Sequence, residues 1–151
     1  MNPARIMVFG TFDILHKGHL DFFKQARNLA ANPYLIVSVA RDRNVKNIKG
    51  RIPVFNQAAR VQTLRRVSLV DKVVLAGLNK HIPHIVKEAP RIIALGYDQK
   101  AYVKNLKSSL KQKGLAVKIV RLKAFKPQIY KSSLSRSQIL RRVGEKPVFM
   151  L

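Results

Sequence analysis

Short runs rich in valine, isoleucine and leucine recur along the chain, as buried strands of a parallel sheet do. They cover residues 6–9, 34–40, 72–76, 91–95 and 116–122. The pattern therefore predicts five strands.

Between these runs, apolar residues recur with the spacing of one helical face. The first such face comprises Leu20, Phe23, Ala26 and Leu29. The second comprises Ala58, Val61, Leu64 and Val67. Asn56 stands where it can cap the second helix. Further helices are predicted over residues 81–87, 100–113 and 137–143.

Strands that alternate with helices imply right-handed crossovers and a parallel sheet covered on both faces. We therefore predict an α/β fold, a Rossmann-like sandwich with a five-stranded parallel sheet flanked by helices. A chain of 151 residues suits one domain, which we expect to span residues 1–151. In such sheets ligands bind outside the carboxyl ends of the strands, at the point where the strand order reverses.

The stretches 41–55 and 123–135 show no clear periodicity and carry several lysines and arginines. We interpret both as long basic loops. Beside a ligand crevice, such loops can close over a phosphate-bearing ligand, although ordinary solvated connections have the same composition.

The net charge is unusual: the chain has 30 lysines and arginines but only 7 acidic residues, which gives +23. Such a field attracts nucleotides, nucleic acid and anionic surfaces alike. The basic residues spread from Arg5 to Lys146, which also fits a solvated basic surface. The chain has no cysteine and no apolar run near the ~20 residues that span a bilayer. We therefore expect a cytoplasmic, soluble protein without membrane insertion.

The segment GTFDILHKGH at residues 10–19 stands where the first strand should end. Gly10 permits a tight turn and a close backbone approach to a ligand, and Gly18 does the same at a helix start. The helix would offer backbone N–H groups to an anion, and His16 and His19 could donate hydrogen bonds to phosphate oxygens. Neither the dinucleotide fingerprint nor the GxxxxGK[ST] loop occurs here.

Zinc is the alternative ligand for these imidazoles, since histidine commonly binds it. Asp13 is the one further candidate nearby, and His81 and His84 belong to a different loop. We therefore predict no protein-held metal.

The segment resembles the GTFDxxHxGH signature of the cytidylyltransferase-like nucleotidyltransferases, which join a nucleoside monophosphate to a phosphorylated acceptor and release pyrophosphate. Three further segments and the helix that carries Arg60 resemble the archaeal FAD synthetase branch of this family. The segments are ARDRNVKNIKGR at 40–51, VDKVVLAG at 70–77 and ALGYDQ at 94–99. Glycerol-phosphate cytidylyltransferases usually have a GDD-like run where this chain has GYDQ, so the resemblance favours adenylyl transfer from ATP to FMN.

The resemblance implies a catalytic set that acts at the phosphates: His16, His19, Lys49 and Arg51. It implies a nucleotide-binding set at the strand ends and helix starts: Gly10, Thr11, Phe12, Asp13, Gly18, Arg60, Gly96, Asp98, Gln99, Ser135 and Ser137. Surface charge remains the alternative for the two basic loop residues of the first set.

Within these sets, the two histidines would bind the α-phosphate. Asp98 and Gln99 would contact the nucleoside, with a turn role as the alternative for Asp98. Ser135 and Ser137 would bind the β- and γ-phosphates at a helix start. SLSRSQILRRV at 133–143 resembles the second signature of the family, and an offset that uses Ser132, Ser133 and Arg136 stays open. Mg²⁺ is expected with the triphosphate.

Two alternatives remain for the activity. One is a cytidylyltransferase that uses CTP and glycerol 3-phosphate or a related alcohol phosphate. The other is a basic module that binds nucleic acid on the same fold, which no RNA-binding signature supports. Relatives in the family are often homodimers. The archaeal branch typically has cysteines near its C-terminal end, where this chain has Leu134.

Overall fold

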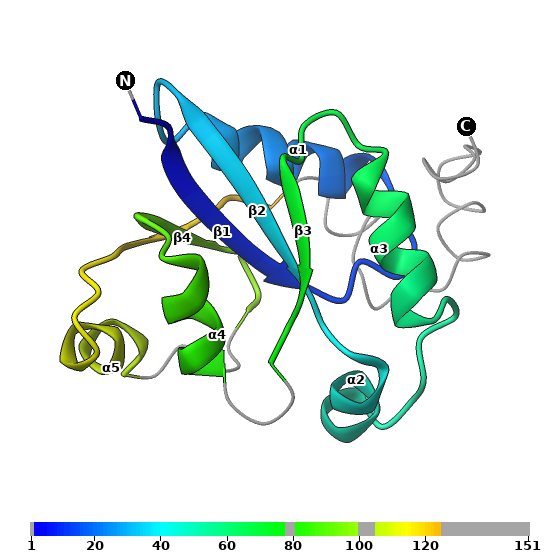
Figure 1. Cartoon of the computed structure of the whole chain (residues 1–151). Coiled ribbons are helices and arrows are strands. Elements are labelled where there is room, and N and C mark those ends of the chain that lie inside the picture. The colour runs from blue at the N-terminus through cyan, green and yellow to red at the C-terminus, as the bar shows by residue number, and fades with distance from the viewer. Residues whose placement is uncertain (1, 78–80, 100–104, 125–151) are drawn as a thin grey trace.

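The computed structural model describes residues 2–77, 81–99 and 105–124. Its strands are β1 (Ala4–Gly10), β2 (Pro33–Val39), β3 (Lys72–Leu75), β4 (Ile92–Leu95) and β5 (Lys118–Arg121). They form one parallel sheet in the order β3-β2-β1-β4-β5 (Figure 1). The predicted strands and the predicted fold class are thus confirmed. The predicted helix over 137–143 lies outside the described residues, as do Ser135 and Ser137.

The strand order reverses between β1 and β4, and the pairing there is short. β1 pairs with β2 from Ala4 to Gly10, whereas it pairs with β4 only at Ile6 and Met7. β4 continues to Leu95 along β5 instead. The carboxyl ends of β1 and β4 are therefore not joined by backbone hydrogen bonds. The space outside these two strand ends is where doubly wound sheets bind ligands.

Alternate residues of the strands face opposite layers of helices. Ile6 and Val8 belong to one core, which also contains Phe23 of α1 (Lys17–Arg27) and Leu64 of α3 (Gln57–Arg65).

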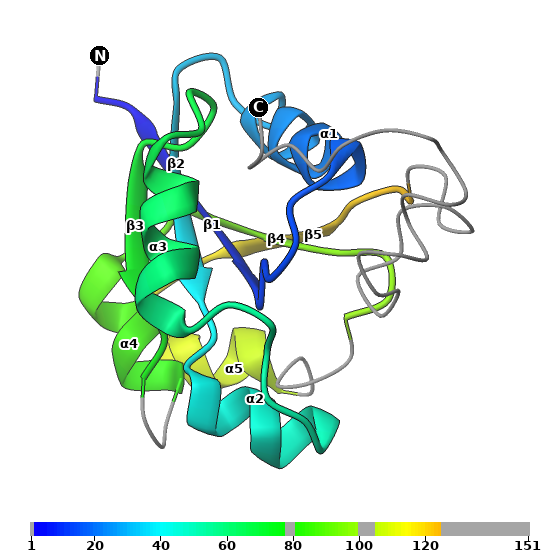
Figure 2. The ribbon, with the colours of Figure 1, turned by 90° about the vertical axis from the view of Figure 1, so that its right-hand side faces the viewer.

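Met7 belongs to the other core, together with Ile85 of α4 (His81–Glu88) and Leu110 of α5 (Leu106–Gln112). Figure 2 shows α1 on one side of the sheet and α4 and α5 on the other. Both faces are covered, as the apolar strands require.

The helices predicted around Phe23, around Leu64 and over 81–87 are confirmed, with one residue placed on the wrong face. Asn56 caps α3 as predicted, because its side-chain oxygen accepts a hydrogen bond from the amide of Ala59 at 2.8 Å. Ala58, however, is exposed, and the buried residues of α3 are Arg60 and Leu64. Val61, Leu64 and Val67 do pack in the core, as predicted. The apolar pattern failed to identify Arg60 as a buried residue of α3 because arginine is charged.

The predicted loop over 41–55 is wrong in part, since residues Asp42–Lys49 form α2. Its sequence holds two apolar residues, Val45 and Ile48, too few for the usual apolar stripe, and Val45 is buried. Tertiary contacts hold it instead: Asn44 donates to the carbonyl of Gly77, and Asp42 accepts from the amide of Gln57. Of the helix predicted over 100–113, residues 100–104 lie outside the described residues, and the described part runs from Leu106 to Gln112.

None of the helices described is both long and apolar enough to cross a membrane.

Candidate active site

The turn after β1 holds its aromatic residue in a backbone conformation that side chains rarely adopt. Phe12 lies in the left-handed region, with φ 52°, and its ring is buried. A Cβ at Gly10 would lie 2.8 Å from that ring. Gly10 is therefore needed because Phe12 folds back over it, whereas the sequence suggested an approach to the ligand.

Two imidazoles follow at the start of α1, and each is fixed by a backbone amide. His16 is the N-cap, and its Nδ1 accepts a hydrogen bond from the amide of Gly18 at 3.1 Å. The Nδ1 of His19 accepts one from the amide of His16 at 3.3 Å. The ring centroids lie 4.0 Å apart. A ring nitrogen that accepts carries no proton, so the neutral form of each ring carries its proton on Nε2.

Burial sets the charge of the first imidazole. His16 is 4% exposed, its Nε2 is buried, and desolvation lowers its pKa from 6.5 to about 4. It is therefore a neutral hydrogen-bond donor at neutral pH. His19 is less buried and packs against the edge of Phe12, with ring centroids 5.6 Å apart.

Gly18 serves this pair directly. Its amide, which could otherwise face an anion at the helix start, donates a hydrogen bond to the Nδ1 of His16. The structure therefore gives this amide an orienting contact inside the protein.

Asp13 joins the turn to the segment between α2 and α3. Its two carboxylate oxygens accept hydrogen bonds from the amides of Val54, at 2.7 Å, and Phe55, at 2.8 Å. Arg51 belongs to the same segment and is exposed. Lys49 ends α2, and its side chain lies outside the described residues.

Arg60 lies beneath the site with a side chain that is 0% exposed. Its guanidinium donates to the carbonyls of Thr11, Ala40 and Phe55 at 2.7–3.0 Å. It also pairs with Asp42 at 2.6 Å. One side chain thus holds together the ends of β1 and β2 and the starts of α2 and α3. A contact with nucleotide phosphates remains a prediction for this residue.

On the other side of β1, Gln99 bridges the gap between the two strand ends. Its Oε1 accepts from the amide of Gly96 at 2.7 Å, and its Nε2 donates to the carbonyl of Phe9 at 2.7 Å. A Cβ at Gly96 would lie 3.3 Å from the Gln99 side chain. The side-chain amide therefore replaces the missing ladder between β1 and β4.

Asp98 stands out among the acidic residues that the structure describes. The other five contact protein groups: Asp13, Asp21, Asp42, Asp71 and Glu88. Asp98 is exposed and makes no hydrogen bond or ion pair within the described part of the chain. It is the acidic side chain that can accept hydrogen bonds from a ligand's hydroxyl groups.

The sequence reasoning missed Arg121, the last residue of β5. Its Nη1 donates to the carbonyls of Gly96 and Gln99, each at 2.8 Å. Arg121 therefore holds the turn that carries Asp98. Its place at the carboxyl end of a predicted strand was the signal available.

The described residues do not form a cage for a divalent metal ion. Among them, no group of three or more histidine or acidic side chains could hold one. Both oxygens of Asp13, the acid within the motif from Gly10 to His19, are engaged by backbone amides. Mg²⁺ is usually held through substrate phosphates and water rather than by an all-protein cage.

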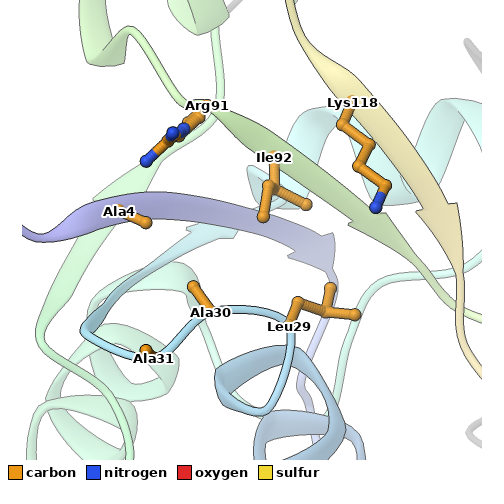
Figure 3. Close-up of a pocket in the computed structure, with 7 residues that line it drawn as sticks. All are labelled: Ala4, Leu29, Ala30, Ala31, Arg91, Ile92 and Lys118. Carbon is orange, nitrogen blue, oxygen red and sulfur yellow. The ribbon is translucent and has the colours of Figure 1, made fainter.

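A cavity of about 360 Å³ lies at the opposite edge of the sheet (Figure 3). It is lined by residues from the amino ends of the strands and the loop after α1: Ala4, Leu29, Ala30, Ala31, Arg91, Ile92 and Lys118. No residue of the motif between Gly10 and His19 borders it, so it is separate from the candidate site.

Known proteins resemble the chain over most of its length. Residues 7–142 match the model of the cytidylyltransferase-like family. The FAD synthase of Thermoplasma volcanium is 36% identical over 142 residues, which cover 94% of this chain and 98% of that protein. The FAD synthase of Korarchaeum cryptofilum is 42% identical over 140 residues, which cover 92% and 90%.

A solved structure gives the same result for the fold. The crystal structure of the lipopolysaccharide core biosynthesis protein from Thermoplasma volcanium superimposes with a TM-score of 0.76 at 35% identity, over 83% of this chain and 100% of the other. The family match and the relatives confirm what the motif from Gly10 to His19 implied. The chain belongs to the cytidylyltransferase-like family, among relatives that include archaeal FAD synthases.

Proposed function

We propose that the protein is an FMN adenylyltransferase, a FAD synthase that transfers AMP from ATP to FMN and releases pyrophosphate. The observation that carries the proposal is the imidazole pair of His16 and His19, whose Nδ1 atoms accept backbone hydrogen bonds. These contacts place the proton of each neutral ring on Nε2, which is the atom that we assign as hydrogen-bond donor to an α-phosphate. The identity of the archaeal FAD synthases to this chain supports ATP and FMN as substrates.

The reaction needs no covalent enzyme intermediate. An ionised phosphate oxygen of FMN attacks the α-phosphorus of ATP and forms the new P–O bond. The bond from that phosphorus to the bridging oxygen breaks, and pyrophosphate leaves with the electron pair. His16, neutral because burial lowers its pKa to about 4, donates without adding a fixed positive charge. The rate gain comes from positioning and from hydrogen bonds to growing negative charge.

The remaining roles in this proposal are those that the family resemblance implies, and Ser135 and Ser137 lie outside the described residues. Asp98 accepts hydrogen bonds from the ribose hydroxyls, held there by Arg121 and the bridge of Gln99. Arg51 and Lys49 approach the phosphates from the other side of β1. Ser135 and Ser137 bind the β- and γ-phosphates.

Mg²⁺ accompanies the triphosphate and neutralises part of its charge. Among the described residues, no group of histidine and acidic side chains suits a protein-held metal ion.

The proposal is tested by incubating the purified protein with Mg²⁺, ATP or CTP, and a panel of acceptors. The panel comprises FMN, glycerol 3-phosphate and phosphocholine. We expect FAD and pyrophosphate from ATP with FMN alone. Turnover only with CTP and an alcohol phosphate would replace this proposal with a cytidylyltransferase. Tight RNA binding at physiological salt without saturable nucleotide binding would reject both enzymes.

A further inference from the structure

The exposed large apolar side chains of the described residues all lie near the carboxyl ends of the strands. Ile52 is 66% exposed, Val54 70% and Tyr97 40%. Tyr97 belongs to the turn after β4, whereas Ile52 and Val54 lie together between α2 and α3. Apolar side chains gathered near a site indicate a surface that a ligand covers.

The segment that carries Ile52 and Val54 is held firmly against the catalytic turn. Asp13 of that turn accepts hydrogen bonds from the amides of Val54 and Phe55. From beneath, Arg60 donates to the carbonyl of Phe55 at 3.0 Å. Val54 is thus exposed beside Asp13, which precedes His16 by three residues, and Ile52 lies two residues before Val54 in the same segment. Surfaces held in place before binding bind ligands with less ordering cost.

The sheet order divides the edge into two sides. β4, with Asp98, lies on one side of β1, and β2, which leads into α2 and the segment after it, lies on the other. Figure 2 shows this segment passing beside the turn that follows β1. If the nucleoside of ATP occupies the β4 side, the acceptor enters from the side of Ile52 and Val54.

We propose that Ile52 and Val54 form the contact surface for the isoalloxazine ring of FMN and thereby select a flavin acceptor. This inference rests on the proposed function. A fused aromatic ring gains free energy by covering apolar side chains, in proportion to the area buried. An alcohol phosphate has no apolar group of that size and gains nothing there. The surface therefore discriminates between acceptors that share the same phosphate chemistry.

Steady-state kinetics of the double variant Ile52→Ala/Val54→Ala test this inference. We expect the KM for FMN to rise by about tenfold, the effect of losing a few apolar groups from a binding surface. The KM for ATP should stay unchanged, since ATP lies on the other side of β1. The conservative pair Ile52→Leu/Val54→Ile keeps the apolar surface and should keep the wild-type KM for FMN. Thermal unfolding of each variant checks that the fold is intact.

Competition by riboflavin gives a second measurement that is independent of phosphate binding. Riboflavin has the ring but no phosphate, so it should inhibit the wild type and inhibit the double alanine variant much less. Equal inhibition of both, or a rise in the KM for ATP rather than FMN, overturns the contact surface while the FAD synthase assignment stands. Failure of the wild type to convert FMN overturns the proposed function and this inference together.

Discussion

At the scale of single residues, the site consists of side chains whose polar atoms are directed by backbone groups. His16 and His19 are oriented by amides of the helix they begin. Gln99 and Arg60 bind carbonyls at the ends of strands. Backbone groups within the fold are fixed, so the side chains that bind them are preorganised before a substrate arrives.

His16→Asn separates the catalytic donor from the helix cap. Asparagine is a good N-cap and can accept the amide of Gly18, but it does not provide the Nε2 donor. We expect kcat to fall by about 100- to 1000-fold, as for the loss of one well-placed donor to a developing charge. A variant with wild-type kcat would exclude His16 from the chemistry.

The same variant tests the burial of the ring through the pH dependence of stability. The folded-state pKa of His16 is about 4, below its ordinary value of 6.5. The unfolded chain therefore takes up a proton first, and stability is lost as the pH falls from 6.5 towards 4. This shift corresponds to roughly 3 kcal/mol. Urea unfolding across that range should show this loss in the wild type and a smaller one in His16→Asn.

At the scale of elements, the site is shaped by the contacts that join the carboxyl ends of the strands. β1 and β4 separate after Met7, and Gln99 spans the gap at the level of Phe9. Arg121 then fastens the same turn to the end of β5. The turn that carries Asp98 is therefore held by side-chain hydrogen bonds, which take the place of backbone hydrogen bonds between β1 and β4.

Arg121→Gln should loosen the turn without touching the imidazoles. A glutamine side chain is shorter and uncharged, so it cannot donate to both carbonyls with the strength of a guanidinium. We expect the KM for ATP to rise by roughly fivefold to tenfold, the net effect of about one ordinary hydrogen bond, with kcat little changed. The matched control is Lys123→Gln, which removes the same charge from an exposed neighbour of the same edge. An equal rise in both variants would indicate a general effect of charge.

At the scale of the whole molecule, five of the six acidic residues that the structure describes contact protein groups, and basic residues far outnumber acidic ones in the sequence. Glu88 is buried and accepts from Arg5 at 3.1 Å and Lys72 at 2.8 Å. Asp71 pairs with Arg27 and also accepts from the amide of Leu35. Most of the basic side chains therefore have no acidic partner to offset the net charge of +23, and they repel one another in the folded state.

Salt should accordingly stabilise the protein. Screening shortens the range of repulsion between exposed charges, from about 30 Å at 0.01 M to about 8 Å at 0.15 M ionic strength. We expect the midpoint of thermal unfolding to rise when KCl is increased over this range. Sucrose at matched osmolality serves as the control. A midpoint that falls with KCl would mean that attractive pairs such as Arg27–Asp71 outweigh the repulsion.

The sequence by itself determined the five strands, the α/β class and the motif from Gly10 to His19. Those features are local: short apolar runs form buried strands, and the motif places its histidines at a helix start whatever surrounds it. The same reasoning predicted the cap at Asn56, which the structure confirms. It also identified the family.

Only the tertiary structure decided how the strand ends are held together. α2 was missed because Asp42 and its distant partners stabilise it rather than an apolar stripe. Arg60 is buried because carbonyls from several segments surround it, which no sequence spacing reveals. Arg121 reaches the turn after β4 only because β5 lies beside β4. Hydrogen bonds between distant segments depend on the chain's path in space, so local pattern cannot predict them.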